Sequence, residues 1–357
     1  MTINTTHQIF IEPLDVLYLR GNKLFGGAGD HGESLMPPWP SMAAGALRSR
    51  LMADGASLAS LAEFKLTRFG LARQTKQGET ETETKTEALW PLPADLIVTE
   101  DDLSNASYLR PTAAPTGIGS SHALPYLPAL RASKPGKPVS GLWLSSAGIA
   151  AWLAGRPILA EHLIRSSKLW RVDPRLGIAL DSATGSAADG KIYTTDTVAL
   201  CDGVGFVAVS AGHESLTKNC SKSCLVRLGG DGRAARVSEV SAPLPVTDWE
   251  RIEREQRFRL ILTTPGIFSA GWQPEGIPAT LLAASVSRAE TVSGWDLVTN
   301  KPKPAQRIAP TGSVYWYGKL TDLNVLKALA DNGLSITDPL RRAEGFNHCF
   351  IAPWQAE

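Results

Sequence analysis

The chain has 357 residues, of which 43% are hydrophobic and 20% charged, and this ordinary globular composition excludes a wholly disordered or fibrous protein. Thirty-six lysines and arginines balance 35 aspartates and glutamates to a net charge of +1, so any site for a polyanion must be a local patch. Four cysteines are too few for a disulfide framework, which favours a reducing compartment. There is no secretory signal pattern, and the longest apolar stretch, at 142–154, is too short to span a bilayer. We therefore expect a cytoplasmic protein without membrane contact.

The first part of the chain predicts a strand, a glycine-rich loop and a short helix. Residues 7–20 are apolar and β-branched, which is typical of a strand, and glycines recur from 21 to 32. The helix is expected over 42–52, with Ser41 as its N-cap. Residues 75–87 are polar and repetitive, so we expect a mobile insertion there.

The remainder of the chain predicts further helices and strands. A helix is expected over 145–169, and two strands at 171–198 form an extended hairpin with a small, polar tip at 182–190. A proline-rich stretch at 241–248 marks a boundary between an N-terminal domain, 1–242, and a C-terminal domain, 243–357. The C-terminal domain predicts strands at 257–268, 313–320 and 345–354 and helices at 278–287 and 322–332. Two β-α-β-β-α-β-like units predict an α+β fold made of two ferredoxin-like units, with insertions in the first.

Motifs for cofactors and metals are weak. Gly27, Gly29 and Gly32 match the spacing of a dinucleotide-binding loop, but the prolines at 37, 38 and 40 forbid the helix that such a loop must open. His213, Cys220 and Cys224 have the spacing of metal ligands, but no fourth ligand is near them in the sequence. We therefore expect no cofactor and no metal.

The residues best suited to chemistry on RNA are few. Asp30 and His31 form the one acid/base pair worth weighing, since His31 could abstract a 2′-hydroxyl proton; otherwise the pair shapes the loop or touches RNA without cleaving it. Lys301, Lys303 and Arg307 form a basic strip, which serves either solubility or phosphate contact. Residues 202–209 partly resemble the RNP1 strand of RNA-recognition domains but lack its stacking rings.

A longer pattern carries a resemblance to a family. An E-P-x-D-x-L-x-x-R opening and a glycine-rich loop precede a run of prolines and P-S-x-x-G-A-L-R, here Glu12, Pro13, Asp15, Leu17, Arg20, Pro40, Ser41, Gly45, Ala46, Leu47 and Arg48. Segments at 175–196, 228–237, 264–274 and 343–354 extend the match. The chain resembles the third Cmr subunit of type III-B CRISPR effector complexes, a member of the RAMP superfamily, with 70–140 as the variable, inserted part. The terminal loop keeps Gly345 but lacks the several glycines of many RAMP proteins.

The resemblance implies a duplicated RAMP architecture of RRM-like, ferredoxin-like units and a role without catalysis. Such a subunit binds the repeat-derived 5′ handle of the CRISPR RNA. It bridges the large palm-domain subunit and the backbone subunits, and it meets the target RNA near the handle only indirectly. The alternative is a RAMP endoribonuclease that processes precursor CRISPR RNA with His31 as general base.

The resemblance also directs attention to particular residues. The glycine-rich loop would let the backbone approach RNA, and the hairpin resembles the thumb that RAMP subunits press against RNA. Arg48 can either face the RNA or pack structurally. The expected RNA-binding residues are Arg20, Gly21, Lys23, Gly26, Gly27, His31, Arg48, Ser182, Thr184, Lys301 and Lys303.

Overall fold

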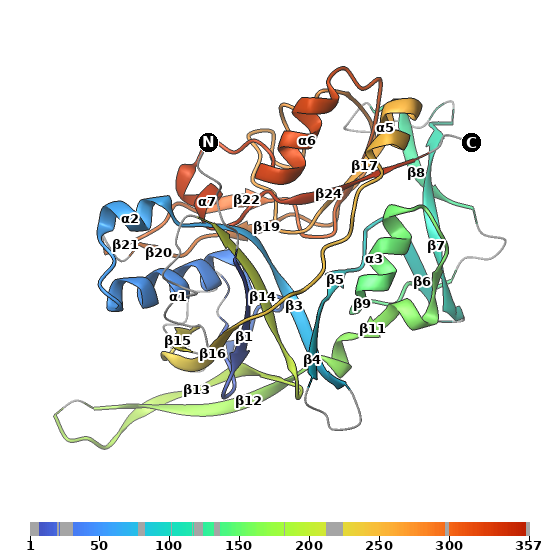
Figure 1. Ribbon diagram of the computed structural model, residues 1–357. Coiled ribbons are helices and arrows are strands. Elements are labelled where there is room, and N and C mark those ends of the chain that lie inside the picture. The colour runs from blue at the N-terminus through green and yellow to red at the C-terminus, as the bar shows by residue number, and fades with distance from the viewer. Residues whose placement is uncertain are drawn as a thin grey trace.

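Two antiparallel sheets, one from each half of the chain, form the frame of the molecule (Figure 1). The computed structural model describes residues 7–19, 21, 31–77, 83–100, 102–115, 117, 124–131, 136–181, 183–211, 224–296 and 300–354. Helices are few and cover the sheets, so the predicted α+β class is confirmed. Among the described residues, no helix is both long and apolar enough to cross a membrane.

The N-terminal sheet has six strands in the order β15-β16-β1-β14-β3-β4. Their bounds are β1 (His7–Pro13), β3 (Lys65–Gln77), β4 (Glu83–Ala88), β14 (Val204–Ala211), β15 (Cys224–Leu228) and β16 (Arg233–Glu239). Successive side chains of a strand point to opposite faces. Ile9 and Ile11 of β1 therefore enter one apolar core, beneath helix α1, while Phe10 enters a second core on the other face. Both faces of this sheet are covered.

Helix α1 (Pro40–Ala53) and the short helix α2 (Leu58–Glu63) cover the first face. Ala43, Ala44, Leu47 and Leu51 are buried on the inner side of α1, as the predicted helix requires. The predicted N-cap at Ser41 is wrong, because the helix begins at Pro40 and its N-cap is Trp39. Pro40 occupies the first helical turn, where its fixed φ and missing N–H are tolerated.

The middle of the chain builds a smaller β-rich layer with one helix. Its elements are β5 (Trp90–Pro91), β6 (Leu96–Thr99), β7 (Asp102–Ala113), β8 (Tyr126–Leu130), β9 (Leu142–Leu144), α3 (Ser146–Leu153), β10 (Ile158–Leu159) and β11 (Leu163–Arg165). The helix predicted over 145–169 is therefore right only for about its first third, Ser146–Leu153. Gly155 and Pro157 end the helical pattern, and the chain continues in short strands and turns.

The predicted mobile insertion at 75–87 is wrong for the residues described. Residues 75–77 belong to β3 and 83–87 to β4, and the two strands pair in register from Gln77 with Glu83 to Ala72 with Ala88. Arg73 Nε donates to Glu87 Oε2 at 2.7 Å, and Thr86 is buried. Residues 78–82 lie outside the described residues.

The predicted hairpin is present as an arm that projects from the body (Figure 1). Strands β12 (Trp170–Leu180) and β13 (Ala187–Leu200) pair along most of their length, and β2 (His31–Gly32) lies parallel to the base of β13. We call this β12–β13 hairpin the arm.

The C-terminal sheet has four strands in the order β18-β23-β17-β24. Its strands are β17 (Arg257–Leu262), β18 (Thr280–Ser285), β23 (Val314–Gly318) and β24 (Cys349–Pro353), and the helices of this half are α5 (Trp249–Glu255), α6 (Leu323–Asn332) and α7 (Pro339–Ala343). Two short antiparallel ribbons accompany the sheet. In the first, β19 (Glu290–Val292) pairs with β22 (Gln306–Ile308), and in the second, β20 (Trp295–Asp296) pairs with β21 (Lys301–Pro302). The helix predicted over 322–332 is confirmed as α6. The helix predicted over 278–287 is wrong, because this segment pairs with β23 as strand β18, and sheet pairing overrides a weak helical propensity.

Candidate nucleic-acid interface

A cleft of about 720 Å³ lies between elements of the N-terminal half of the chain and elements of the C-terminal half. On the N-terminal side it is lined by Tyr18, by one side of α1, and by the turn at 229–232 that joins β15 to β16. On the C-terminal side it is lined by 293–295, by Lys303 after β21, and by Arg341 of α7. We call it the glycine-lined cleft, because six glycines face it, at 21, 45, 229, 230, 232 and 294.

Glycine is present at two positions of the cleft for different reasons. Gly229 has φ of +74°, and a Cβ on it would lie 2.8 Å from the Tyr18 carbonyl oxygen, so the tight turn itself demands glycine. Gly45, in contrast, stands in the interior of α1, where glycine costs roughly 1 kcal/mol relative to alanine. A Cβ on Gly45 would meet nothing within 4 Å, so packing does not explain this glycine. Its effect is to leave the cleft open beside the helix.

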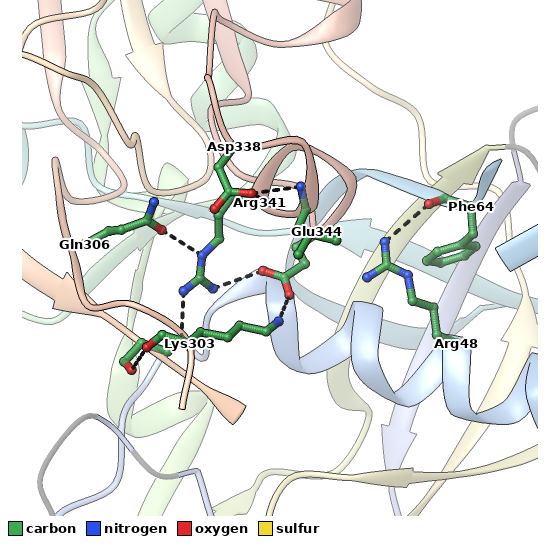
Figure 2. Close-up of polar contacts among 9 residues, drawn as sticks. Arg48, Phe64, Lys303, Gln306, Asp338, Arg341 and Glu344 are labelled. Carbon is green, nitrogen blue, oxygen red and sulfur yellow. Dashed lines mark hydrogen bonds and ion pairs between the residues drawn. The ribbon is translucent and has the colours of Figure 1, made fainter. Parts of the chain in front are cut away.

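A buried ionic cluster forms the C-terminal wall of the cleft (Figure 2). Glu344, which is buried, accepts from Lys303 Nζ on one oxygen and from Arg341 Nη1 on the other, the latter at 3.0 Å. Arg341 Nε donates to Gln306 Oε1 at 2.9 Å, and its Nη2 donates to the Ser293 carbonyl at 3.1 Å. Arg341 therefore ties α7 to the two ribbons, while two cations share one carboxylate and leave the cluster with a net positive charge.

Aromatic rings and a further cation complete the cleft. Trp295 is 54% exposed, and its Nε1 donates to Asn300 Oδ1 at 3.3 Å. Tyr18 and Trp39 also line the cleft, and the Arg233 guanidinium lies 5.3 Å from the centre of the Tyr18 ring. Arg227 is exposed at the end of β15. Exposed rings beside cations are the combination that binds single-stranded nucleic acid, by stacking and by charge.

The structure brings two of the expected RNA-binding residues together in this cleft. Gly21 and Lys303 both line it, although they are far apart in the sequence. Lys301 is exposed in β21 on the neighbouring ribbon, and Thr184 is exposed at the tip of the arm, where its hydroxyl hydrogen-bonds to that of Ser186 at 2.7 Å. Five more of the expected set, Arg20, Lys23, Gly26, Gly27 and Ser182, lie outside the described residues.

Arg48, for which a structural and an RNA-binding role were both expected, packs against Phe64 in the structure. Its guanidinium lies 5.5 Å from the centre of the Phe64 ring, and Nη2 donates to the Phe64 carbonyl at 3.4 Å (Figure 2). Burial lowers the pKa of Arg48, and the nearby Glu344 carboxylate partly opposes that effect. These contacts orient α1 against the strand that begins after Phe64.

His31 lies on β2, beside strand β13 of the arm, and Asp30, the acid weighed with it, lies outside the described residues. Its Nδ1 is 3.0 Å from Thr194 Oγ1 and its Nε2 is 3.3 Å from Asp196 Oδ2, both on β13. Nothing in the sequence indicates Asp196 as a partner of His31, because only strand pairing brings these residues together.

Sequence reasoning missed the residues that make the wall of the cleft. Arg227, Trp295, Arg341 and Glu344 become neighbours only through the tertiary fold. The one local signal was the Gly-Gly-Asp-Gly turn at 229–232, which marks a close backbone approach immediately after Arg227.

The structure gives no support for a metal centre in the described ranges. No group of three or more histidine, cysteine, aspartate or glutamate side chains there could hold a metal ion. His213 and Cys220 lie outside the described residues. Cys224 is buried and disulfide-bonded, whereas Cys201 and Cys349 are free.

Comparisons with known proteins identify the fold and the family of this chain. Two solved chains have the same overall fold: one from a type III-B Cmr-beta complex bound to cognate target RNA, and one from that complex bound to cognate target RNA and AMPPnP. The first is 15% identical with a TM-score of 0.53 over 96% of both chains, and the second is 14% identical with a TM-score of 0.55 over 96% of this chain and 95% of the other. No curated protein matches the sequence. The model of the CRISPR-associated protein family Cas_Cmr3 matches residues 9–354, nearly the whole chain. This chain therefore belongs to the Cas_Cmr3 family, which confirms its resemblance to the third Cmr subunit of type III-B CRISPR effector complexes.

Proposed function

We propose that this protein is a non-catalytic subunit that binds the repeat-derived 5′ handle of the CRISPR RNA in the glycine-lined cleft. The observation that carries the proposal is the cleft itself, which combines an open backbone surface, a net positive wall and an exposed indole. Solved complexes of the same fold are described as bound to target RNA. The net charge of the chain is only +1, so its affinity for RNA must come from a local, positively charged site such as this cleft.

The lining of the cleft suits a single RNA strand. Glycines allow phosphates to approach backbone N–H groups closely, and Lys303 and Arg227 supply positive charge without a metal. Trp295 offers a flat, exposed face on which a base can stack. Leu19 lines the cleft, and it is followed in the sequence by the expected residues Arg20, Lys23, Gly26 and Gly27. We therefore propose that these four residues contact the same RNA.

We further propose that the chain bridges the large palm-domain subunit and a backbone subunit in the cytoplasm, and meets the target RNA near the handle indirectly. The arm supports this role, because it projects from the body and carries exposed aliphatic side chains (Figure 1). The strand orders β16-β1-β14-β3 and β24-β17-β23-β18 support a duplicated ferredoxin-like plan for the frame that holds cleft and arm.

The decisive experiment fills the cleft without disturbing the fold. Gly45→Leu places a side chain in the cleft, whereas Gly45→Ala adds only a methyl group at the same point of α1. Both variants should be at least as stable as the wild type, since the change removes a glycine from a helix interior. We expect Gly45→Leu to weaken binding of handle RNA about tenfold or more, and Gly45→Ala to leave it within about twofold. Wild-type affinity in the folded Gly45→Leu protein would place the RNA elsewhere.

A further inference from the structure

A second cleft, of about 500 Å³, borders α7 and shares no lining residue with the glycine-lined cleft. It is lined by the loop at 267–275, by Gln306 and Arg307 of β22, by residues 335–337, and by Arg342 of α7. We call it the β22 cleft. Adjacent residues of α7 thus serve different clefts, Arg341 the first and Arg342 the second.

The β22 cleft is built from hydrogen-bond donors. Three hydroxyls line it, those of Ser269, Ser335 and Thr337, together with the guanidinium groups of Arg307 and Arg342. Arg307 is exposed and, within the described part of the chain, forms no ion pair. Arg342 is half-buried, and its Nη2 makes a long hydrogen bond of 3.4 Å to the Ile336 carbonyl, which fixes the side chain at the wall. Arginine and hydroxyl side chains are the usual ligands of phosphate oxygens.

The one carboxylate in the lining, Glu275, is engaged in bracing the loop. Its Oε2 accepts from Ser269 Oγ at 3.2 Å, and its Oε1 accepts from the Ala270 N–H at 3.1 Å. Two arginines against one glutamate leave the β22 cleft with a net charge of about +1. An anion therefore meets a surplus of positive charge.

Little apolar surface is available in the β22 cleft for a protein anchor. Phe268 is only 7% exposed, and Ile267 and Ile336 pack against the small core beneath the cleft. Protein interfaces are anchored by aromatic or aliphatic side chains at their centre. The chemistry of this lining favours a phosphate group.

A short polar connection joins the two clefts. Gln306 lines the β22 cleft and accepts from Nε of Arg341, which lines the glycine-lined cleft, at 2.9 Å (Figure 2). Because Arg341 is also fixed by Glu344 and by the Ser293 carbonyl, the spacing between the clefts is rigid. A strand that leaves the first cleft across α7 therefore meets the second at a constant distance.

We propose that the β22 cleft binds a phosphodiester of the same RNA strand that occupies the glycine-lined cleft, with Arg307 and Arg342 as its phosphate ligands. This inference rests on the proposed RNA-binding function and extends it to a second contact. Arg307 and Arg342 set the affinity and salt dependence of RNA binding without reading the sequence.

The test removes the positive charges of the β22 cleft in the full chain. Arg307→Gln with Arg342→Gln empties the β22 cleft of positive charge, and Arg254→Gln, on the exposed side of α5, is the matched control. Affinity for guide RNA that contains the handle is measured across a salt series. We expect the double variant to bind about tenfold or more weakly. Its slope of log K against log salt should be shallower by about 1.4, the value for two lost phosphate contacts on a single strand.

Further variants distinguish a failure of this inference from a failure of the proposed function. Arg307→Lys with Arg342→Lys keeps the charge and should keep the salt slope, because counterion release depends on charge. If Gly45→Leu weakens binding but the Gln double variant behaves like Arg254→Gln, the β22 cleft does not bind RNA, while the proposed function stands. If Gly45→Leu has no effect, the proposed site fails independently. Unchanged RNA affinity with lost assembly of neighbouring subunits would assign the β22 cleft to a protein and overturn the inference.

Discussion

His31 is held at both ring nitrogens, by Thr194 Oγ1 and by Asp196 Oδ2. A general base must have a ring nitrogen within reach of the proton that it abstracts and able to accept it. We therefore predict that the purified chain does not cleave precursor repeat RNA, with or without divalent metal. Incubation with end-labelled repeat RNA, resolved on a denaturing gel, measures this. Specific cleavage that disappears in His31→Ala would instead support the ribonuclease alternative.

His348 predicts a pH dependence of stability. Its imidazole is fully buried, and burial together with the cations Arg68 and Arg342 lowers its pKa from 6.5 to about 3. The ring is therefore neutral in the folded state, and the unfolded chain binds a proton that the native state does not. The contribution of His348 is fully present above pH 6.5 and is lost as the pH falls towards 3.

Between pH 6.5 and pH 5.5 we expect His348 to reduce the free energy of unfolding by about 1 kcal/mol. Urea unfolding at both pH values measures the change for the wild type and for His348→Gln. The variant is less stable overall, but its stability should depend less on pH by that amount. An equal pH dependence in His348→Gln and wild type would contradict the prediction.

The sequence could indicate some cleft residues but not their roles. The charge of Lys303 between prolines and the place of Gly21 in a glycine-rich loop indicate contact with RNA, and both residues line the cleft. Glu344 could not be found in this way, because a buried carboxylate that bridges two cations is defined only after α7 packs on the ribbons. The role of Arg48 depended on how α1 is rotated against Phe64, which periodicity does not specify closely enough.

At the level of elements, the arm carries a stripe of exposed aliphatic side chains. Val172, Leu176, Ile178 and Leu180 occupy alternate positions of β12, so they share one face, and Ile192 of β13 pairs with Ile178. Their exposed fractions run from 52% to 71%. A contiguous apolar face on a projecting hairpin is typical of a surface that another molecule covers.

We predict that Leu176→Thr with Ile178→Thr leaves the fold intact and weakens assembly with neighbouring subunits about tenfold or more. Threonine is β-branched and suits a strand, and substitutions at exposed positions change stability by within about 0.5 kcal/mol. Co-purification with the other subunits and guide RNA measures assembly, and thermal unfolding measures stability. Arg175→Thr, on the opposite face of β12, is the control. Normal assembly of the double variant would exclude the stripe as a docking face.

Local patterns predicted some elements well and others badly. The arm and α6 could be predicted because their alternation, turn residues and leucine spacing are contained within the segment. Strand β4 could not, because an edge strand of threonine, lysine and glutamate buries little and is held by pairing with β3. Strand β18 was mistaken for a helix because its leucines and alanines suit either structure, and only β23 decides between them.

On the scale of the whole molecule, one apolar core joins the two sheets. Phe10 and Val207 of the N-terminal sheet share this core with Trp152 of α3 and with Ile261 and Phe350 of the C-terminal sheet. The glycine-lined cleft lies between elements of both halves and therefore depends on their fixed arrangement. The sequence indicates a boundary at 241–248, but it could not show that the two halves share buried side chains, because those side chains are far apart in the sequence.

A buried ion pair reinforces this junction and supports a final prediction. Asp95 lies in the middle layer and accepts from Arg259 Nη1 of β17 at 2.8 Å and from Trp152 Nε1 at 2.8 Å. The Arg259 guanidinium lies 3.9 Å from the centre of the Trp152 ring. Asp95 is fully buried and Arg259 nearly so, so the removal of either partner leaves an uncompensated charge away from water.

We predict that the chain unfolds in one cooperative transition and that Arg259→Ala or Asp95→Ala lowers its free energy of unfolding by about 3–5 kcal/mol. Asp95→Leu with Arg259→Met removes both charges and should restore much of the loss, because no buried charge then remains unpaired. The exposed pair of Arg236 and Glu12, at 2.8 Å, is the control, and Arg236→Ala should cost at most about 1 kcal/mol. Urea unfolding followed by tryptophan fluorescence and by circular dichroism makes the measurement. If the two signals separate in the wild type, the halves fold independently, and the cleft between them cannot be rigid in the way that RNA binding at a fixed spacing requires.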